Sequence, residues 1–243
     1  MMIDIHCHIL PGLDDGAFSE DESLAMAEIA AAGGIRAICC TPHSGGYPFD
    51  TLVQTYRRFK DAVRERNLPL QLYLGQEIYL GDNMRAQIRA LQHGFPVTLN
   101  RSVYPLIEFH PDVQTKFVFS AVEELVSLGY IPVIAHPERY AFAAEDVHAL
   151  RRLKKAGALL QLNCGSLKGV FGYTAERIAN DLLGRCEADF VASDAHSPYA
   201  RTPRLHGVHA YISEQYSLEY ADHLMCGNPQ KLVHNRRIDP FVS

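Results

Sequence analysis

The sequence has no excess of basic residues. Its 243 residues include 23 lysines and arginines against 28 aspartates and glutamates, which gives a formal net charge of −5 at pH 7. Nucleic acids and anionic membrane surfaces are bound through clustered positive charge, whereas the charges here alternate in short stretches. We therefore expect no nucleic-acid partner.

Long apolar runs are also missing, because Glu28 and Arg36 interrupt the longest one. A membrane-spanning helix needs about 20 consecutive apolar residues, so direct membrane insertion is not expected. A strand-like segment begins at residue 3 and leaves no room for the charged and apolar regions of a signal peptide. These features predict a cytoplasmic protein.

Cysteine pairs with CxxC spacing are absent. Most of the six cysteines lie in apolar runs, as reduced and buried thiols do. Disulfide frameworks are typical of small secreted domains, and none is expected in this chain.

What the sequence does contain is a repeating alternation of short apolar segments and amphipathic stretches. The apolar segments predict strands at 2–8, 35–42, 70–77, 103–109, 131–136, 158–164 and 189–194. The amphipathic stretches predict helices at 20–32, 50–66, 117–128, 145–156 and 174–184, with two more after residue 204. Such alternation predicts a parallel sheet in a single α/β domain that covers residues 1–243.

A parallel sheet of this kind can close into a distorted (β/α)7 TIM-like barrel, or it can remain open and doubly wound. The open alternative usually carries a GxGxxG fingerprint after a strand, and the sequence has none. We therefore expect the distorted barrel, in which functional groups gather at the carboxyl ends of the strands.

Histidines and carboxylates occur at six of the seven predicted strand ends. The candidates are His6, His8, Asp14, His43, Glu77, Glu108, His136, Asp194 and His196. Any one of them alone is more often a cap or a satisfied polar group, but agreement between six strand ends favours a common site. Along the first strand, alternation places Asp4, His6 and His8 on the face toward the barrel interior and Cys7 on the other.

These candidates are too many for one metal ion, since a catalytic zinc typically uses about three protein ligands. We therefore expect two or three divalent ions. Imidazole nitrogens and carboxylate oxygens without a thiolate suit manganese, iron(II) or zinc. With three ions, the four carboxylates leave a formal surplus of about two positive charges, which would attract an anion such as phosphate.

The motifs around these residues resemble those of the PHP (polymerase and histidinol phosphatase) superfamily. The segments DIHCHILPGLDDGA, TPH, AHPERY and SDAHSPYART are similar to those of the bacterial metal-dependent protein-tyrosine phosphatases of the CpsB/CapC/YwqE type. The resemblance covers essentially the whole chain. It implies a PHP-type barrel that removes phosphate from protein phosphotyrosine through attack of a metal-bound hydroxide, in the regulation of capsule and exopolysaccharide synthesis. The implied partner is the C-terminal tail of a bacterial tyrosine kinase.

The same resemblance implies a trinuclear centre, with manganese as the first choice of metal. The first ion would be held by His6, His8, Glu77 and Asp194, the second by Glu77, Glu108 and His136, and the third by Asp14, His43 and His196. Arg139 and Arg201 would grip the phosphate, because a guanidinium matches phosphate oxygens in a bidentate manner. His196 or a metal-bound water could protonate the leaving group. Asp4 could orient a ligand imidazole, but a simple strand-edge hydrogen bond would explain its position as well.

Alternative functions remain open at this point. A small-molecule phosphatase of the histidinol-phosphatase type would use nearly the same cluster. The loop 165–169 could border the substrate pocket, with Lys168 supplying positive charge, or it could be an ordinary βα turn. A polymerase-associated nuclease would need a basic groove and a longer chain. A non-catalytic metal-binding regulator should have lost ligands, and none is missing. A cysteine-dependent phosphatase is disfavoured, because no cysteine has an arginine six residues further on.

Overall fold

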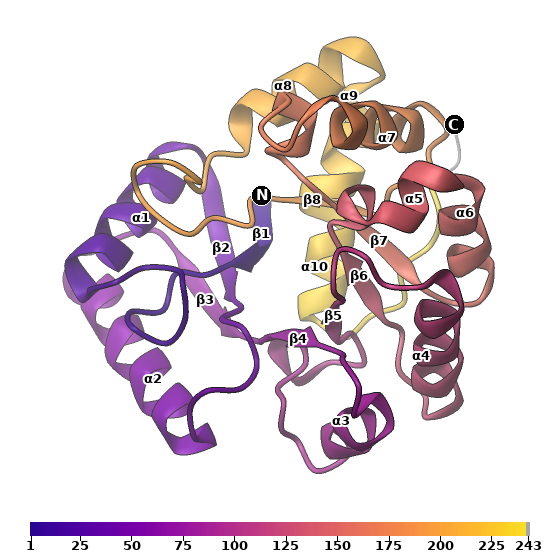
Figure 1. Cartoon of the computed structure of the whole chain (residues 1–243). Helices are drawn as coiled ribbons and strands as arrows, with labels where there is room; N and C mark the ends of the chain where they lie inside the picture. Colours follow the sequence, from indigo (N-terminus) through magenta and orange to yellow (C-terminus); the bar gives the residue numbers. More distant parts are fainter. Residues whose placement is uncertain (242–243) are drawn as a thin grey trace.

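Eight short parallel strands form the centre of the computed structural model, which describes residues 1–241 (Figure 1). The strands are β1 (Met2–Cys7), β2 (Ile35–Cys40), β3 (Gln71–Leu74), β4 (Glu77–Tyr79), β5 (Leu106–Glu108), β6 (Val133–Ala135), β7 (Leu159–Asn163) and β8 (Phe190–Ala192). They form two sheets, ordered β1-β2-β3 and β4-β5-β6-β7-β8, in which all pairs are parallel. The predicted α/β class is confirmed.

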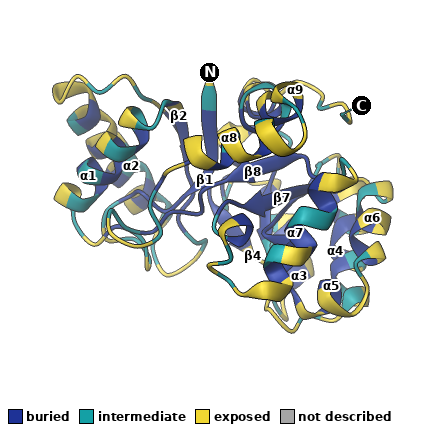
Figure 2. Ribbon diagram, turned by 90° about the horizontal axis from the view of Figure 1, so that it is seen from above, coloured by how far each residue is buried: buried dark blue, intermediate teal, exposed yellow. Residues whose placement is uncertain are grey.

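Helices surround the strands, so that the strands are buried and the helices expose their outer faces (Figure 2). The α-helices are α1 (Glu20–Ala32), α2 (Phe49–Glu65), α3 (Met84–Leu91), α4 (Thr115–Ser127), α5 (Ala141–Glu145), α6 (His148–Lys155), α7 (Tyr173–Gly184), α8 (His206–Gln215), α9 (Leu218–Asp222) and α10 (Asn228–Val233). Shorter helical turns are η1 (Leu99–Arg101), η2 (Pro137–Arg139), η3 (Ser166–Lys168) and the π-helical η4 (His223–Gly227). Across residues 1–241, no helix has the length and apolar character needed to cross a membrane.

Two isolated parallel bridges connect the two sheets. One bridge joins Cys7 to Ala195 beyond the end of β8, and the other joins His43 beyond the end of β2 to Glu77. These bridges form two seams between the sheets, in keeping with the distorted barrel that the sequence predicts. The seams therefore bring segments that follow β1, β2 and β8 together with the start of β4.

The segment 70–77, predicted as one strand, forms two strands, β3 and β4, separated by Gly75 and Gln76. The buried side chain of Gln76 accepts a hydrogen bond from the amide of Val97 at 2.9 Å and donates one to the hydroxyl of Tyr47 at 3.0 Å. These two hydrogen bonds hold Gln76 between β3 and β4, because a buried amide needs partners for both its oxygen and its nitrogen, and both partners lie outside the strand. The barrel therefore has one strand more than the sequence predicted.

Apolar side chains fill the barrel interior toward the amino ends of the strands. Ile3 and Ile5 of β1 belong to one buried cluster with Leu232 and Val233 of α10. The register of β1 shifts between Asp4 and Cys7, so the strict alternation predicted along this strand is not kept. The side chain of Asn100, before β5, donates a 2.7 Å hydrogen bond to the carbonyl of Val233, which fixes α10 at this end. The opposite end of the barrel is thereby left for polar side chains.

The helix predictions succeed where local signals are strong. Helix α1 begins and ends as predicted, and the hydroxyl of Ser19 accepts a hydrogen bond from the amide of Glu22 at 3.3 Å, as an N-cap does. Helix α3 was not predicted, and the predicted helix 145–156 is shorter, since α6 begins at His148. Three α-helices and η4 follow residue 204 in place of two helices.

Candidate metal centre

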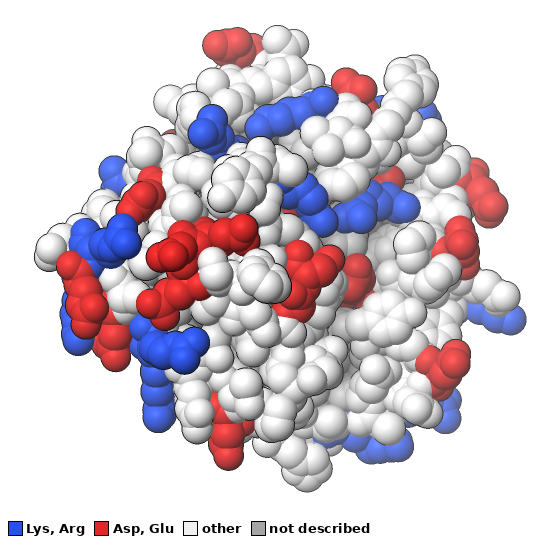
Figure 3. Space-filling view, turned by 60° about the vertical axis from the view of Figure 1, so that its left-hand side comes forward, with Lys and Arg blue, Asp and Glu red and all other residues white. Residues whose placement is uncertain are grey.

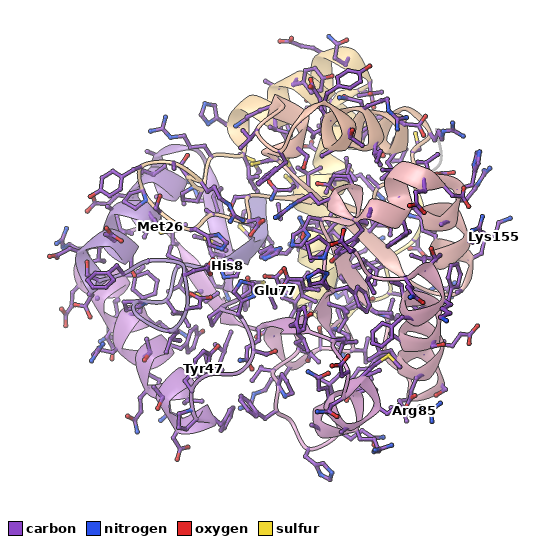
Figure 4. The ribbon with its side chains drawn as sticks, in the orientation of Figure 1. His8, Met26, Tyr47, Glu77, Arg85 and Lys155 are labelled. Carbon is purple, nitrogen blue, oxygen red and sulfur yellow. The ribbon has the colours of Figure 1, made fainter. Side chains whose placement is uncertain are left out.

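The predicted histidines and carboxylates lie together at the carboxyl ends of the strands. Figure 4 shows His8 and Glu77 in the middle of the molecule, and His8 Nε2 lies 3.2 Å from Glu77 Oε2. His6, His8, Glu77, His136, Asp194 and His196 are buried, whereas Asp14, His43 and Glu108 are half-buried. Three groups of possible ligand atoms occupy this edge, and within each group all atoms lie within 4.8 Å of one another.

The first group contains His6, His8 and Asp194. The Nε2 atoms of the two histidines are 3.1 Å apart, and each lies 3.2 Å from Oε2 of Glu77. Asp194 Oδ1 lies 3.5 Å from His6 Nε2 and 3.6 Å from His8 Nε2. The four residues predicted to share the first ion are therefore adjacent.

The second group contains His43, Glu77 and Glu108. Nδ1 of His43 lies 3.2 Å from Glu77 Oε2 and 3.4 Å from Glu108 Oε2. His136 Nε2 approaches the other oxygens of the same carboxylates, at 3.0 Å from Glu77 and 3.8 Å from Glu108. Glu77 thus faces both groups, as expected of a bridging carboxylate.

The third group contains His8, Asp15, His43 and His196. Asp15 Oδ1 lies 3.5 Å from His43 Nε2 and 3.4 Å from His196 Nε2. The sequence analysis did not name Asp15 as a ligand, because it assigned the carboxylate beside His43 and His196 to Asp14. The DD pair in GLDDGA was the available signal, and it could not tell which of the two carboxylates turns toward the imidazoles.

Asp14 instead holds the other side of His8. Its Oδ2 accepts hydrogen bonds from His8 Nδ1 at 2.7 Å and from the amide of His43 at 2.8 Å, while Oδ1 accepts one from the amide of Gly16 at 3.0 Å. A carboxylate in this position fixes the ring so that Nε2 points at the cluster. Gly16 is required here, because a Cβ atom would lie 2.2 Å from the carbonyl oxygen of His8.

Two amide side chains, which sequence reasoning missed, orient further ligands. His6 Nδ1 donates to Gln161 Oε1 at 2.8 Å, so its Nε2 is free to bind a cation. Asn163 Nδ2 donates to Asp194 Oδ2 at 2.6 Å. Both residues lie on β7, the one strand whose end offered no ligand, and this explains why they carried no signal.

Of the two roles open for Asp4, the structure shows the strand-edge hydrogen bond and not contact with a ligand imidazole ring. Its carboxylate accepts hydrogen bonds from the amide and the hydroxyl of Ser193 at 3.0 and 2.5 Å, and it contacts the backbone amide of His6, not the ring of an imidazole. Burial is the main reason that the pKa of Asp4 rises to about 6. Asp4 therefore fastens the end of β8, which carries Asp194, to β1.

Backbone strain occurs at two of the candidate ligands. His136 has φ of 35° and Asp194 has φ of 51°, in the left-handed region that residues other than glycine rarely adopt. Such conformations cost about 1–3 kcal/mol each and persist where the surroundings hold them, often at functional sites. Here the strain turns both side chains from their strand ends toward the cluster.

Two arginines adjoin the cluster through the same carboxylate oxygen. Asp194 Oδ2 lies 3.2 Å from Arg139 Nη1 and 2.5 Å from Arg201 Nη2, and each arginine side chain is 31% exposed. The guanidinium groups also lie over the ring of Phe171, at 4.4 Å for Arg139 and 5.7 Å for Arg201. The arginines predicted to grip phosphate are thus partly accessible and held against both an anion and an aromatic face.

A cavity of about 320 Å³ opens beside these groups. Its lining includes Glu108, Pro111, His136, Arg139, Tyr140 and Phe171. A smaller cavity of about 80 Å³ also has Phe171 in its lining, together with Arg201 and Lys168. Lys168 therefore borders the site, as predicted, and Phe171 is an aromatic wall that sequence reasoning missed.

The donor set fits divalent cations. Nitrogen and oxygen atoms from different strand ends converge within 4.8 Å, and Gln161 and Asp14 present His6 and His8 with Nε2 toward the cluster. No thiol belongs to any of the three groups, so the chemistry suits manganese, iron(II) or zinc.

Proton release should accompany cation binding. Burial disfavours the charged form of His8, but hydrogen bonds to Asp14 and Glu77 outweigh it and raise the pKa of His8 to about 10. At neutral pH the metal-free imidazolium must therefore release its Nε2 proton to solvent when a cation binds at this nitrogen. Competition with this one proton should lower the apparent affinity for the cation about tenfold for each pH unit below 10.

Calorimetry of manganese binding in buffers of different ionisation enthalpy, at pH 6.5 and 8, measures this release. Asp14→Asn should reduce it, because the strongest hydrogen bond favouring the imidazolium is weakened. An enthalpy that does not depend on the buffer would contradict the protonated state of His8.

The strand order, the two seams and the polar edge define an α/β barrel with a histidine–carboxylate cluster at the carboxyl ends of its strands. Residues 2–234 match the model of the family described as capsular polysaccharide synthesis, CpsB/CapC, and the chain belongs to this family.

Related proteins agree with this assignment. The chain is 35% identical over 242 residues to tyrosine-protein phosphatase YwqE of Bacillus subtilis, covering 98% of this chain and 93% of the relative. It superposes with a TM-score of 0.91, 32% identity and coverage of 99% and 97% on a chain from the crystal structures of YwqE from Bacillus subtilis and CpsB from Streptococcus pneumoniae, described as unique metal-dependent tyrosine phosphatases. Organophosphorus hydrolase from Deinococcus radiodurans, at 18% identity and a TM-score of 0.61, shares the fold.

Proposed function

We propose that this chain is a metal-dependent protein-tyrosine phosphatase, in which residues 1–243 act as one catalytic domain. The observation that carries the proposal is the arrangement of Asp194. One of its oxygens faces the imidazoles of His6 and His8, and the other binds Arg139 and Arg201. A cation site and a pair of phosphate-binding guanidinium groups are thereby joined at a single carboxylate. The activity attributed to YwqE and CpsB supports the same reaction.

The proposed ligands follow the three groups of atoms. The first ion takes His6, His8, Glu77 and Asp194, the second takes Glu77, Glu108 and His136, and the third takes Asp15, His43 and His196. His8 also belongs to the third group, and His43 also faces the second. Asp14 takes the role of orienting His8 instead of binding an ion. Manganese is the metal we favour, and iron or zinc would suit the same donors.

In the proposed mechanism, the bound ions supply Lewis acidity and an activated water. Arg139 and Arg201 bind the phosphate oxygens and stabilise the charge that develops on them. Phe171 and Asp194 hold the two like-charged guanidinium groups in place. Tyrosinate has an intrinsic pKa near ~10, so its departure needs less protonation than that of an alkoxide.

His196 fits a ligand better than a general acid. Its Nδ1 donates a hydrogen bond to the carbonyl of Asp194 at 3.0 Å, which leaves Nε2 toward Asp15. Burial, followed by the charge of His8, lowers the pKa of His196 to about 4, so the ring is neutral at pH 7. We propose that water protonates the leaving group.

The buried thiols argue against cysteine chemistry. Burial raises the pKa of Cys164 to about 12 and that of Cys7 well above its usual value. A nucleophilic cysteine needs the opposite shift, because the thiolate is the reactive form. All six cysteines are unpaired, in keeping with the cytoplasmic location that we propose.

The substrate that we propose is phosphotyrosine on a protein, in particular the C-terminal tail of a tyrosine kinase that regulates capsule or exopolysaccharide synthesis. Membership of the capsular polysaccharide family supports this choice. A histidinol-phosphatase-type enzyme is the second candidate, and turnover of a phosphotyrosyl peptide against that of histidinol phosphate separates the two.

Chelation should abolish hydrolysis of a phosphotyrosyl peptide, and added manganese should restore it, because the nucleophile and most of the positive charge come from the ions. Alkylation of thiols under native conditions should leave the rate unchanged. Elemental analysis of the purified protein gives the number of ions. Activity that survives chelation and is lost on alkylation would overturn the proposal.

A further inference from the structure

The four most exposed large apolar side chains of residues 1–241 all lie at the edge of the barrel that carries the candidate centre. They are Phe18 at 85%, Tyr199 at 82%, Tyr173 at 76% and Val170 at 63% exposure. We call these four residues the apolar rim. Single exposed apolar residues are ordinary on protein surfaces, but a concentration of the most exposed ones around one site is not.

Each rim residue is close in sequence to a residue of the centre. Phe18 is three residues beyond Asp15, in the loop that follows β1. Tyr199 lies between His196 and Arg201, in the loop that follows β8. Val170 and Tyr173 flank Phe171, between η3 and the start of α7. The rim therefore belongs to three loops at the carboxyl ends of β1, β7 and β8.

The rim loops are held by backbone hydrogen bonds. In the first loop, Gly12 N donates to Ala17 O at 2.8 Å, and Ala17 N donates to His8 O at 3.1 Å. Phe18, next in the chain, is thus fixed to the strand end that bears His8. Ordered loops hold this side chain in water, where its exposure is unfavourable unless something covers it.

The other two loops are tied in the same manner. His196 N and Ser197 N both donate to the carbonyl of Arg201, at 2.9 and 3.2 Å, so that Tyr199 lies at the middle of a closed turn. Val170 N donates to Gly165 O at 3.0 Å. The rim residues therefore keep fixed places relative to the arginine and the cavity wall.

Charge is distributed unequally around the rim. Exposed Glu20 lies two residues beyond Phe18, whereas exposed Lys168 and Arg204 lie near Val170 and Tyr199 in sequence. Figure 3 shows acidic and basic groups next to each other on one face of the molecule. A partner that crosses the site would thus meet apolar contacts with opposite charges on its two sides.

We propose that the apolar rim binds the polypeptide on either side of the phosphotyrosine, so that the substrate is a protein segment with apolar residues flanking the modified tyrosine. This inference rests on the proposed phosphatase function and extends it to the choice between protein and small-molecule substrates. Aromatic residues are the usual anchors of protein interfaces, and the rim contains three of them. Val170 lines the smaller cavity together with Phe171 and Arg201, and this continuity between the rim and a phosphate-binding arginine favours the phosphoprotein as the occupant.

The test compares two substrates of the manganese-loaded full chain. One is p-nitrophenyl phosphate, which has an aryl phosphate and no peptide, and the other is a phosphotyrosyl peptide with leucine and phenylalanine on both sides. The quadruple variant with Phe18→Ser, Val170→Ser, Tyr173→Ser and Tyr199→Ser should lower the ratio of kcat/KM for the peptide to that for p-nitrophenyl phosphate about tenfold, mainly through KM. A peptide with serine in the flanking positions should show the same loss on the unchanged protein.

Leu218→Ser is the matched control, because Leu218 is 59% exposed on α9 and lies outside the rim loops. It should leave the ratio unchanged. A quadruple variant with an unchanged ratio would overturn the inference. If sedimentation velocity also showed a change in the oligomeric state of that variant, the rim would be a contact with a second copy of the chain. If these variants still hydrolyse p-nitrophenyl phosphate, the proposed phosphatase function is retained and only the role of the rim is rejected. If the unchanged protein hydrolyses neither substrate, the phosphatase function itself is rejected.

Discussion

Replacing Glu77 with glutamine should remove at least one metal ion from the purified protein and lower kcat at least about 100-fold, since even residues that only orient ligands are worth about 10–100-fold in affinity or activity. Glu77 is 1% exposed and faces four imidazoles. Its Oε2 lies 3.2 Å from His6 Nε2, His8 Nε2 and His43 Nδ1, and its Oε1 lies 3.0 Å from His136 Nε2. Glutamine has the same shape, but it is neutral and presents N–H groups to nitrogens that must bind cations.

The charge of Glu77 is maintained in spite of burial. Burial favours the neutral acid, but the charge of His6 and the hydrogen bonds from His136, His6 and His8 hold the pKa of Glu77 well below its usual range. The carboxylate is therefore ionised at neutral pH. Loss of one negative charge from the centre of the cluster lowers the affinity for every cation that Glu77 faces.

Glu138→Gln is the matched control for metal content. Glu138 is also 1% exposed, but it accepts hydrogen bonds from the amide of Asn163 and the hydroxyl of Ser166 instead of facing imidazoles. Elemental analysis should give full occupancy for Glu138→Gln and reduced occupancy for Glu77→Gln. Equal metal content in the two variants, with activity retained in Glu77→Gln, would show that Glu77 is not a metal ligand.

The fold was largely predictable because its signals are local. Apolar segments fixed the approximate places of the strands, and Ser19 and Glu22 marked the start of α1 to the residue. The division of segment 70–77 was not predictable, because it depends on Gln76 pairing with Val97 and Tyr47, which are distant in sequence. Tertiary contacts of this kind leave no periodicity in the chain.

The site was predictable to the extent that it lies at strand ends. A parallel barrel brings those ends together, so histidines and carboxylates at six of them predict one cluster. The choice between Asp14 and Asp15 depends on the path of a loop that Gly16 permits, and Gln161, Asn163 and Phe171 act through contacts with residues far away in sequence. Side-chain amides and aromatic rings are too common in cores to indicate such roles from sequence.

Replacing Arg201 with alanine should lower kcat/KM for a phosphotyrosyl peptide about 100- to 1,000-fold, the loss typical of one donor that stabilises transition-state charge. Metal content should stay as it was, because Arg201 contacts Asp194 only through Oδ2, and Asn163 and Arg139 still bind that oxygen. Arg201→Lys should recover only part of the rate, since an ammonium lacks the planar fork that binds two phosphate oxygens. Arg237→Ala is the control, because Arg237 is 90% exposed after α10 and outside the rim loops, and its rate should stay within about twofold. Steady-state kinetics with elemental analysis on the same samples separate the outcomes: loss of metal from Arg201→Ala would make the arginine a support of the centre, and an unchanged rate would remove it from phosphate binding.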